Sequence, residues 1–194
     1  MQELVSINFR DDFGIVLDSL GLNGIGIEIG VRIGEFSEIL LRNTKLKQIC
    51  FLDAWKEYPP DLYQDLANCS QQEQDQRYAI TVNKLKRYGD RARIIRKDCV
   101  DAVNDFEDCY FDFIYIDANH EYQYIKRDIN DWYPKLKAGG LFSGHDYIDD
   151  CVKSNGSFGV KGAVNEFCSS HSVKPYSTLA PAHQHTPSWY FVKS

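Results

Sequence analysis

The amino-acid sequence predicts an α/β fold with a doubly wound, Rossmann-like sheet of seven mostly parallel strands and helices on both faces. Short apolar runs, rich in β-branched residues, alternate with segments of helical spacing along the 194 residues. Five successive runs end in an acid, and the helical segments between them favour parallel strands. The length suits one domain and is too short for two, so we expect a single domain over residues 1–194. Its leading helix would lie in 1–23 and its core in 24–194.

Residues 1–23 carry apolar side chains at roughly helical spacing, among them Phe13, Val16 and Leu20. This spacing predicts a helix that packs on the edge of the domain. In that position the helix would help to cover a ligand site.

The first strand passes through glycines directly into a helix. Residues 24–34 read Gly-Ile-Gly-Ile-Glu-Ile-Gly-Val-Arg-Ile-Gly. Glycine permits a positive φ and a close approach of the backbone to a ligand, and the free N–H groups of a helix start favour an electron-rich partner. A dinucleotide site requires G-x-G-x-x-G, but Ile29 stands where the third glycine would be. The pattern that remains is Glu28-x-Gly30-x-x-x-Gly34, which still predicts a nucleotide-like cofactor.

The second apolar run, residues 47–53, ends in Asp53, 25 residues after Glu28. Doubly wound nucleotide sites place at about this distance a carboxylate that accepts the hydroxyl protons of a ribose. Asp53 is therefore the candidate ribose ligand, and the alternative is an acid that only closes a turn or caps a helix. Trp55 follows in an aromatic and proline-rich segment, which would wall an adenosine pocket or a substrate entrance, or would pack in the core.

A polar run at residues 68–76 predicts an exposed loop or the start of a helix, and helical spacing follows over 78–88. The third apolar run, residues 92–99, again closes on an acid, Asp98, with Cys99 behind it. Asp98 is also suited to cap the short helix that follows.

The clearest strand of the sequence covers residues 110–117 and ends in Asp117, with His120 three residues later. After it we expect a helix at 122–136, a turn at 137–140, a strand at 141–147, a Gly/Ser/Asn-rich loop at 153–159, a helix at 160–168, and strands near 173–179 and 188–193. The strand at 141–147 carries His145 and Asp146 at its mouth.

Acidic residues thus end five successive strands. They are Glu28, Asp53, Asp98, Asp117 and Asp146. Because the carboxyl ends of parallel strands meet at the same edge of a sheet, we expect these side chains to gather there. Folding does not require charge at such regular positions, so the series predicts a functional site.

Composition excludes several classes of function. The formal net charge of −6 and pI near 5.3, with lysine and arginine interspersed among acids, argue against a nucleic-acid partner. The N-terminus lacks the pattern of a signal peptide, and no apolar run approaches the roughly 20 residues of a membrane span. The six cysteines form no C-x-x-C pair and are expected to be reduced. We expect a cytoplasmic protein without membrane contact, and the sequence leaves open a homo-oligomer.

Several separated segments resemble one subgroup of the class I S-adenosylmethionine-dependent methyltransferases, the small-molecule O-methyltransferases related to the macrolide-sugar and aminocoumarin-sugar enzymes. The pattern Glu28-x-Gly30-x-x-x-Gly34 is similar to their first motif. The other segments are residues 116–122, 134–140, 144–147, 159–161 and 189–193. The resemblance covers about residues 24–193. It implies a sheet that ends in an antiparallel hairpin and methyl transfer from S-adenosylmethionine to a hydroxyl of a small molecule, such as a sugar.

The resemblance also implies a cofactor site. In these enzymes the residues after the third strand flank the adenine, where Asp98 and Cys99 stand here. We expect the donor to be bound by Glu28, Gly30, Gly34, Asp53, Trp55, Asp98, Cys99 and Asp117.

Relatives in this family hold a divalent metal between an acid after the fourth strand and two adjacent acids after the fifth. Asp117 matches the first acid and Asp146 one of the pair, whereas His145 replaces the other. The implied metal ligands are therefore Asp117, His145 and Asp146, with Mg²⁺ or Mn²⁺ as the ion. Histidine suits Mn, Fe or Zn better than Mg²⁺, which prefers oxygen.

The catalytic candidates are His145, His120 and Asp117, at the mouths of strands expected to be neighbours. A histidine accepts a proton near neutral pH. Adjacent residues of an extended segment point to opposite sides, so His145 and Asp146 would face one site only if the chain turns there. We favour His145 as general base or metal ligand and His120 as the second choice; the alternative is loop histidines bonded to backbone.

Two other functions stay open. One is an NAD-dependent oxidoreductase, against which the missing third glycine counts. The other is a binding protein of the same fold without catalysis, against which the collection of histidines and acids counts.

Overall fold

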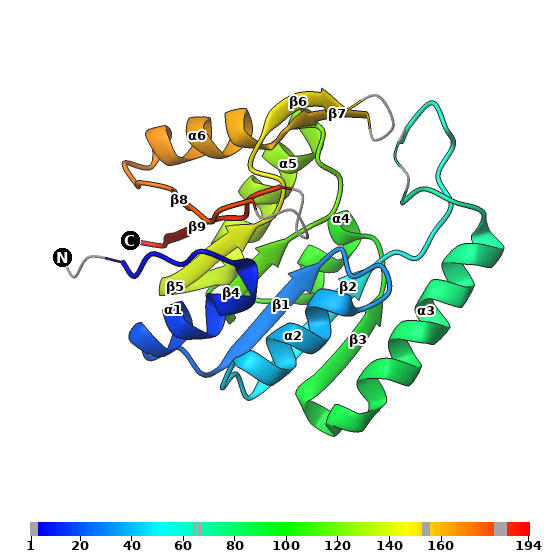
Figure 1. Ribbon diagram of the computed structural model, residues 1–194, viewed down its shortest axis with the longest axis horizontal. Helices are drawn as coiled ribbons and strands as arrows, with labels where there is room; N and C mark the ends of the chain where they lie inside the picture. The colour runs from blue at the N-terminus through cyan, green and yellow to red at the C-terminus, as the bar shows by residue number, and fades with distance from the viewer. Residues whose placement is uncertain (1–3, 64, 66, 153–155, 181–185) are drawn as a thin grey trace.

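A seven-stranded sheet runs through the middle of the molecule in the order β3-β2-β1-β4-β5-β9-β8 (Figure 1). The computed structural model describes residues 4–63, 65, 67–152, 156–180 and 186–194. Its sheet strands are β1 (Ile25–Ile29), β2 (Gln48–Asp53), β3 (Ala92–Arg96), β4 (Phe111–Ile116), β5 (Leu136–Gly144), β8 (Tyr176–Ser177) and β9 (Trp189–Val192). Strands β1 to β5 pair in parallel, while β9 pairs antiparallel with both β5 and β8. The predicted mostly parallel sheet with a C-terminal antiparallel hairpin is confirmed.

Helices cover both faces of the sheet. They are α1 (Phe13–Ser19), α2 (Glu35–Asn43), α3 (Gln71–Leu85), α4 (Cys99–Ala102), α5 (Tyr122–Trp132) and α6 (Val160–Ser170), with short 3₁₀ turns at Arg10–Asp12, Lys86–Arg91, Val103–Asp105 and Tyr133–Lys135. Helices α1 to α3 pack on one face and α4 to α6 on the other. None of the described helices is long and apolar enough to cross a membrane.

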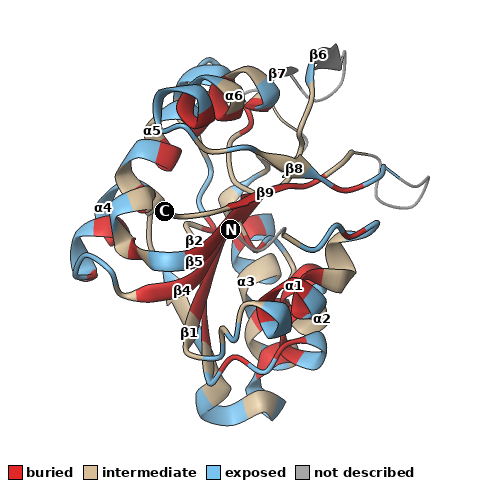
Figure 2. Cartoon of the chain, turned by 90° about the vertical axis from the view of Figure 1, so that its left-hand side faces the viewer, coloured by how far each residue is buried: buried red, intermediate tan, exposed pale blue. Residues whose placement is uncertain are grey.

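Side chains alternate between two apolar cores along each central strand, as the two-residue period requires. On β4, Ile114 and Ile116 join the core beneath α4 to α6, while Phe113 and Tyr115 join the core beneath α1 and α2. Figure 2 shows the buried strands at the centre, with exposed residues on the outer sides of the helices. Because both faces are covered, the strands read as continuous apolar runs in the sequence.

Two glycines shape the junction between β1 and α2. Gly30 has φ +90° and Gly34, the N-cap of α2, has φ +70°. A Cβ on Gly30 would lie 2.0 Å from the carbonyl oxygen of Asp117, so only glycine lets β1 end this close to β4. The glycine spacing in the sequence therefore has a backbone cause as well as the functional one that we expected.

Three boundaries differ from the sequence-based expectation. Helix α3 begins at Gln71, inside the polar run for which the sequence left open a loop or a helix start, and the side chain of Ser70 caps it by accepting a hydrogen bond from the N–H of Glu73. The helix ends at Leu85 and not at residue 88, because a 3₁₀ turn follows over Lys86–Arg91. Strand β5 already begins at Leu136, since the residues expected to form a turn extend it past a register shift opposite Phe111.

The third difference is a short antiparallel ribbon of β6 (Asp149–Val152) and β7 (Gly156–Gly159), where a loop was expected at residues 153–159. Residues 153–155 lie outside the described residues. The ribbon stands at the carboxyl edge of the sheet, before α6 (Figure 1).

Candidate active site

A cavity of about 1030 Å³ opens at the carboxyl edge of the sheet. It is lined by the ends of β1, β2, β3, β4 and β5, by the turn before α1, and by the segment between β2 and α3. Ligand pockets commonly enclose about 300–1,000 Å³. The volume therefore suits a ligand of nucleotide size with room for a second molecule.

Most of the predicted site residues line this cavity. They are Glu28, Gly30, Asp53, Asp98, Cys99, Asp117, His120, His145 and Asp146. Two others do not. Gly34 caps α2, and Trp55 is 1% exposed, with its indole N–H donating to the carbonyl of Arg32 at 2.8 Å and its ring against Tyr78. Trp55 thus follows the packing alternative that the sequence left open.

The carboxylate of Asp53 accepts three backbone hydrogen bonds. Its Oδ2 accepts from the N–H groups of Val31 and Arg32, and its Oδ1 accepts from the N–H of Trp55, all at 2.8 Å. Of about four acceptor positions on a carboxylate, three are therefore engaged. Asp53 fixes the glycine-containing turn after β1 and keeps capacity for about one further donor.

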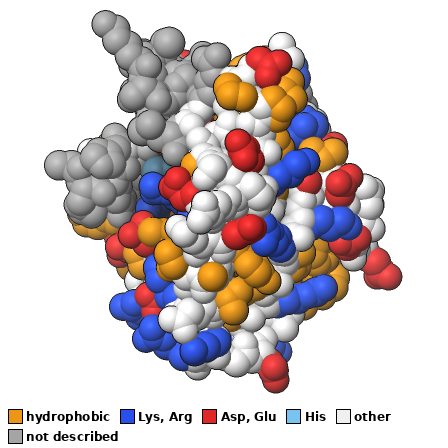
Figure 3. Space-filling view, turned by 90° about the vertical axis from the view of Figure 1, so that its right-hand side faces the viewer, with side chains coloured by type: hydrophobic (Ala, Val, Ile, Leu, Met, Phe, Trp, Pro, Cys, Tyr) orange, Lys and Arg blue, Asp and Glu red, His pale blue; other side chains and the backbone are white. Residues whose placement is uncertain are grey.

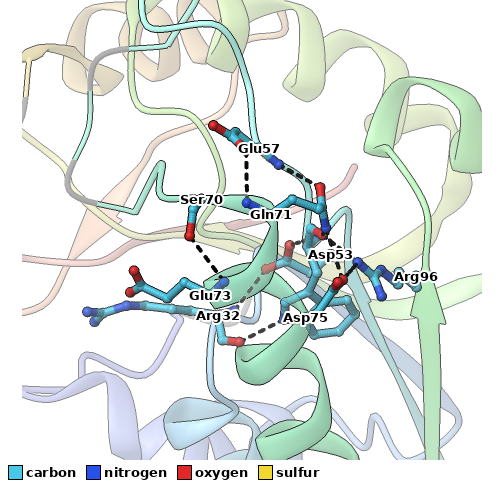
Figure 4. A network of polar contacts seen from close by, with 9 residues as sticks. Arg32, Asp53, Glu57, Ser70, Gln71, Glu73, Asp75 and Arg96 are labelled. Carbon is cyan, nitrogen blue, oxygen red and sulfur yellow. Dashed lines mark hydrogen bonds and ion pairs between the residues drawn. The ribbon is translucent and has the colours of Figure 1, made fainter.

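Polar contacts join the segment after β2 to the start of α3, as Figure 4 shows. The N–H of Glu57 donates to the side-chain oxygen of Gln71 at 3.1 Å, and the N–H of Gln71 donates to the carboxylate of Glu57 at 2.9 Å. The Gln71 amide group also donates to the carbonyl of Trp55 and to Asp75, which pairs with Arg96. These contacts hold one wall of the cavity in place.

Asp98 lies at the end of the cavity beside β3. Its Oδ1 accepts from the N–H of Val100 at 3.2 Å, which caps α4, and its Oδ2 accepts from the hydroxyl of Tyr58 at 2.8 Å. The capping alternative is therefore present, and it leaves Asp98 on the cavity wall. Next to it, burial raises the pKa of the Cys99 thiol, so Cys99 is a neutral, weakly polar wall.

Glu28 lies at the end of β1 beneath the cavity and is 1% exposed. The hydroxyl of Ser37, on α2, donates to its Oε2 at 2.5 Å. Burial outweighs this hydrogen bond and raises the pKa of Glu28 to about 8. Near neutral pH the group is therefore mainly a protonated, hydrogen-bonding acid.

Asp117, His145 and Asp146 come together at the mouths of β4 and β5. The Nδ1 atom of His145 lies 3.6 Å from Oδ1 of Asp117 and 3.3 Å from Oδ1 of Asp146. Asp146 has φ +55°, so the chain has already turned after β5 and both neighbours face the same site. The hydroxyl of Thr186 donates to Asp146 at 2.6 Å and lies 3.4 Å from Nε2 of His145.

Charge is unevenly distributed over these three groups. Burial opposes the charged form of His145, but the carboxylates of Asp117 and Asp146 outweigh it and raise the pKa of the imidazole. Burial also opposes the charged form of Asp117, yet His145 and Arg10 hold its pKa below the usual value. Burial and the charge of Asp117 raise the pKa of Asp146. Of the two aspartates, Asp117 is thus the one that is ionised more readily.

The two carboxylates and the imidazole are also groups that commonly bind divalent metals. One potential ligand atom from each of Asp117, His145 and Asp146 lies within 4.8 Å of the others. Atoms bound to one ion at about 2.0–2.2 Å are at most about 4.4 Å apart, so the three groups lie close to the spacing that one ion requires. Two carboxylates and one imidazole favour Mn, Fe or Zn over Mg.

His120 lines the same cavity as this group. Its Nε2 is 3.3 Å from Oδ2 of Asp65, which belongs to the segment between β2 and α3, and its ring stacks on Phe158 at 3.8 Å between centroids. It is buried, at 7% exposure. Asp65 and the β7 residue Phe158 contact His120, and its electrostatic interaction with Asp117 and Asp146 indicates that it lies near them. Its expected role beside these acids stays a prediction.

Sequence reasoning missed several residues of the site. Arg10, Asp65, Asp128 and Thr186 line the cavity. They lie before the first strand, in long connections or on a helix, so the pattern of strand-ending acids could not reveal them. Their only signal in the sequence is a polar residue within an otherwise unpatterned segment.

A model of a methyltransferase-domain family matches residues 27–147, which is more than half of the chain. The protein y4gI of Sinorhizobium fredii, itself uncharacterized, is 34% identical over 55 residues, which are 28% of this chain and 6% of that protein. The chain thus spans a small part of the length of this curated relative.

Solved structures share the fold over nearly the whole chain. An O-methyltransferase from Bacillus cereus in complex with S-adenosylhomocysteine has a TM-score of 0.65 and 15% identity, covering 98% of this chain and 83% of its own. A Burkholderia thailandensis 1,6-didemethyltoxoflavin-N1-methyltransferase, with 1,6-didemethyltoxoflavin and S-adenosylhomocysteine bound, has a TM-score of 0.61 and 15% identity. The match covers 95% of this chain and 77% of that protein. An rRNA methylase from Streptococcus thermophilus has a TM-score of 0.60 and 13% identity, and the match covers 97% of this chain and 99% of that protein. At these identities the likeness concerns the fold alone.

Proposed function

The chain belongs to the methyltransferase-domain family, and we propose that it transfers a methyl group from S-adenosylmethionine to a hydroxyl group of a small molecule. The observation that carries this proposal is the cavity at the carboxyl edge of the sheet, where acids at the ends of β1 to β5 meet two histidines. S-adenosylhomocysteine bound to two proteins of the same fold supports the identity of the donor.

The donor would lie across the carboxyl ends of the strands. Its adenine would lie beside Asp98 and Cys99, and one ribose hydroxyl would donate to the free acceptor position of Asp53. The turn at Gly30 would let the rest of the donor pass close to the backbone between β1 and β4. The protonated Glu28 beneath it would add a hydrogen-bond donor without a charge to be buried.

Methyl transfer from a sulfonium requires little covalent help, because the donor supplies an activated methyl group. The protein must hold the acceptor oxygen in line with that group, exclude water and remove one proton. Asp117 and Asp146 would orient the acceptor hydroxyl at the mouths of β4 and β5. His145 is the proposed general base, since its two carboxylate neighbours stabilise the imidazolium that forms when it accepts the proton.

A divalent metal is the second way in which the same residues could serve. Asp117, His145 and Asp146 would hold the ion, which would lower the pKa of an acceptor hydroxyl. His145 would then be a ligand and would bind as the neutral imidazole. Because its pKa is raised in the protein, metal binding would release a proton that can be measured.

A small acceptor is favoured over RNA by charge. The net charge is −6, and on the face that Figure 3 shows lysine and arginine side chains lie among aspartates and glutamates. A phosphate backbone would require a basic patch. The rRNA methylase with the same fold makes RNA the second acceptor class to be tested.

Two measurements test this proposal. The first is calorimetric titration with S-adenosylmethionine, S-adenosylhomocysteine and NAD; binding of NAD without either sulfur compound would contradict a methyltransferase. The second is methyl transfer from labelled donor to hydroxylated small molecules, nucleotide-sugars and ribosomal RNA, with and without Mn²⁺ or Mg²⁺. Label in RNA alone would contradict the small-molecule acceptor, and donor binding without any transfer would favour a protein that only binds.

A further inference from the structure

One cation stands inside the cavity among groups that we have assigned to methyl transfer. Arg10, in the turn before α1, lines the cavity, and its side chain is 21% exposed. Its Nη1 donates to Oδ2 of Asp117 at 3.4 Å, and its guanidinium lies 4.7 Å above the ring of Phe36. Arg10 lies in the N-terminal segment, before residues 27–147, which the family model matches.

The guanidinium of Arg10 has donors to spare. Of its five N–H groups, one makes the long hydrogen bond to Asp117 and another interacts with the hydroxyl of Tyr115. Its Nε is buried and has no hydrogen-bond partner among the described residues. Burying an unpaired charged donor is costly, so a ligand that pairs with it would bind favourably.

The other cations of the cavity wall differ from Arg10. Lys97 pairs with Asp105, Arg77 with Glu73 and Arg127 with Asp128. The remaining two among the described lining residues, Arg32 and Lys56, are exposed at the rim. Arg10 is thus the partly buried cation nearest to the acid–histidine group.

We propose that Arg10 binds a carboxylate of a ligand in this cavity, and that this carboxylate is the one in the amino-acid portion of the methyl donor. A planar guanidinium matches a carboxylate with two parallel hydrogen bonds. The contact between the guanidinium of Arg10 and the ring of Phe36 restricts its movement. The inference rests on the proposed function, which supplies the donor.

Asp117 separates the donor side of the site from the acceptor side. Its Oδ2 faces Arg10, while its Oδ1 faces Nδ1 of His145. An amino-acid end carries a carboxylate and an ammonium on one carbon, and the neighbouring charges of Arg10 and Asp117 complement both. The acceptor then lies on the other side of Asp117, beside His145 and Asp146.

The raised pKa of Glu28 is consistent with this assignment. Because Glu28 is mainly protonated near neutral pH, it does not neutralise the positive charge of Arg10. Asp117 alone, at 3.4 Å, balances that charge in the described part of the site.

The test compares S-adenosylmethionine with decarboxylated S-adenosylmethionine, which differs from it in the carboxylate alone. Dissociation constants are measured by calorimetry for the parent protein, Arg10→Met, Arg10→Lys and Arg42→Met. Arg42 is a matched control, because its side chain is 61% exposed and pairs with Glu38 on α2 away from the cavity. Thermal melting of each variant checks that it folds.

We expect the parent protein to bind the carboxylated donor about 10- to 100-fold more tightly than the decarboxylated one, as a charge-assisted pair would give. Arg10→Met should remove this preference by weakening only the carboxylated donor. Arg10→Lys should keep part of it, and Arg42→Met all of it. An Arg10→Met protein that folds and keeps the full preference would overturn the assignment to the donor.

A second arm identifies a carboxylate on the acceptor as the source instead. Benzoate is titrated into the parent protein and Arg10→Met, with and without saturating S-adenosylhomocysteine. Benzoate binding that requires Arg10, together with an unchanged donor preference, would move the carboxylate to the acceptor; if neither ligand depends on Arg10, the inference is wrong. Failure of the parent protein to bind either donor would instead refute the proposed function. In that case the benzoate titration without S-adenosylhomocysteine would still decide whether Arg10 binds a carboxylate.

Discussion

Glu28 is a buried acid whose proton affects folding as well as the site. Its pKa is raised by burial from 4.5 to about 8. Between these two values the folded protein binds a proton that the unfolded chain has released, so stability falls as pH rises through this window. The stabilisation that the protonated Glu28 provides is complete below about pH 4.5 and is lost above about pH 8.

We predict that Glu28→Gln, which keeps an acceptor for the hydroxyl of Ser37, removes this pH dependence. Urea unfolding of the parent protein should show stability falling from pH 5 to pH 8 by on the order of a few kcal/mol more than in the variant. Parallel curves for the two proteins across this range would mean that Glu28 ionises in the folded state much as it does in the unfolded chain.

His145 is the residue on which turnover should depend most. We predict that His145→Ala lowers methyl transfer by about 10²- to 10⁴-fold, the usual contribution of a general base, and leaves donor affinity nearly unchanged. Because its pKa is raised, the acidic limb of the parent pH–rate profile should lie above the value of about 6.5 for free histidine. His171→Ala on the C-terminal end of α6 is the control; a His145→Ala protein that turns over at the parental rate would exclude the role.

At the level of elements, the β1–α2 junction tolerates little change. We predict that Gly30→Ala destabilises the protein by several kcal/mol, since φ is +90° and the added Cβ would meet the carbonyl of Asp117 at 2.0 Å. Gly89→Ala is a matched control, because its φ is also positive but nothing lies within 4 Å of the added atom. Chemical unfolding measures both, and equal losses would show that the clash with β4 relaxes freely.

The elements that the sequence predicted well are those with a regular apolar period. The central strands and α2, α5 and α6 appear within a few residues of their expected bounds, because both sheet faces are buried and apolar side chains fill them. The sequence left open whether α3 begins inside the polar run; Ser70, which accepts a hydrogen bond from the N–H of Glu73, marks that start. The β6–β7 ribbon could not be predicted, since its strands are short and carry glycine and polar residues.

At the scale of the whole molecule, topology explains which site residues the sequence could reveal. Acids at the ends of parallel strands must share one edge, so the gathering of Asp117 with Asp146 followed from the strand order. Arg10 and Asp65 reach the same cavity from segments whose path depends on packing, and no local pattern marks them. His120 is at the expected edge, but its pairing with Asp65 depends on how the long connection after β2 folds back.

Binding of the donor should therefore stabilise the whole fold, since its site draws on the ends of five strands and the N-terminal turn. We predict that S-adenosylhomocysteine at 100 times its dissociation constant adds about 2.7 kcal/mol to the free energy of unfolding. For a chain of this size that corresponds to a rise of roughly 5–11 °C in melting temperature. NAD at the same concentration is the control, because the β1–α2 turn lacks the third glycine of a dinucleotide site. A shift with NAD equal to or larger than that with S-adenosylhomocysteine would mean that this edge of the sheet recognises a dinucleotide, and the assignment of the donor would have to be abandoned.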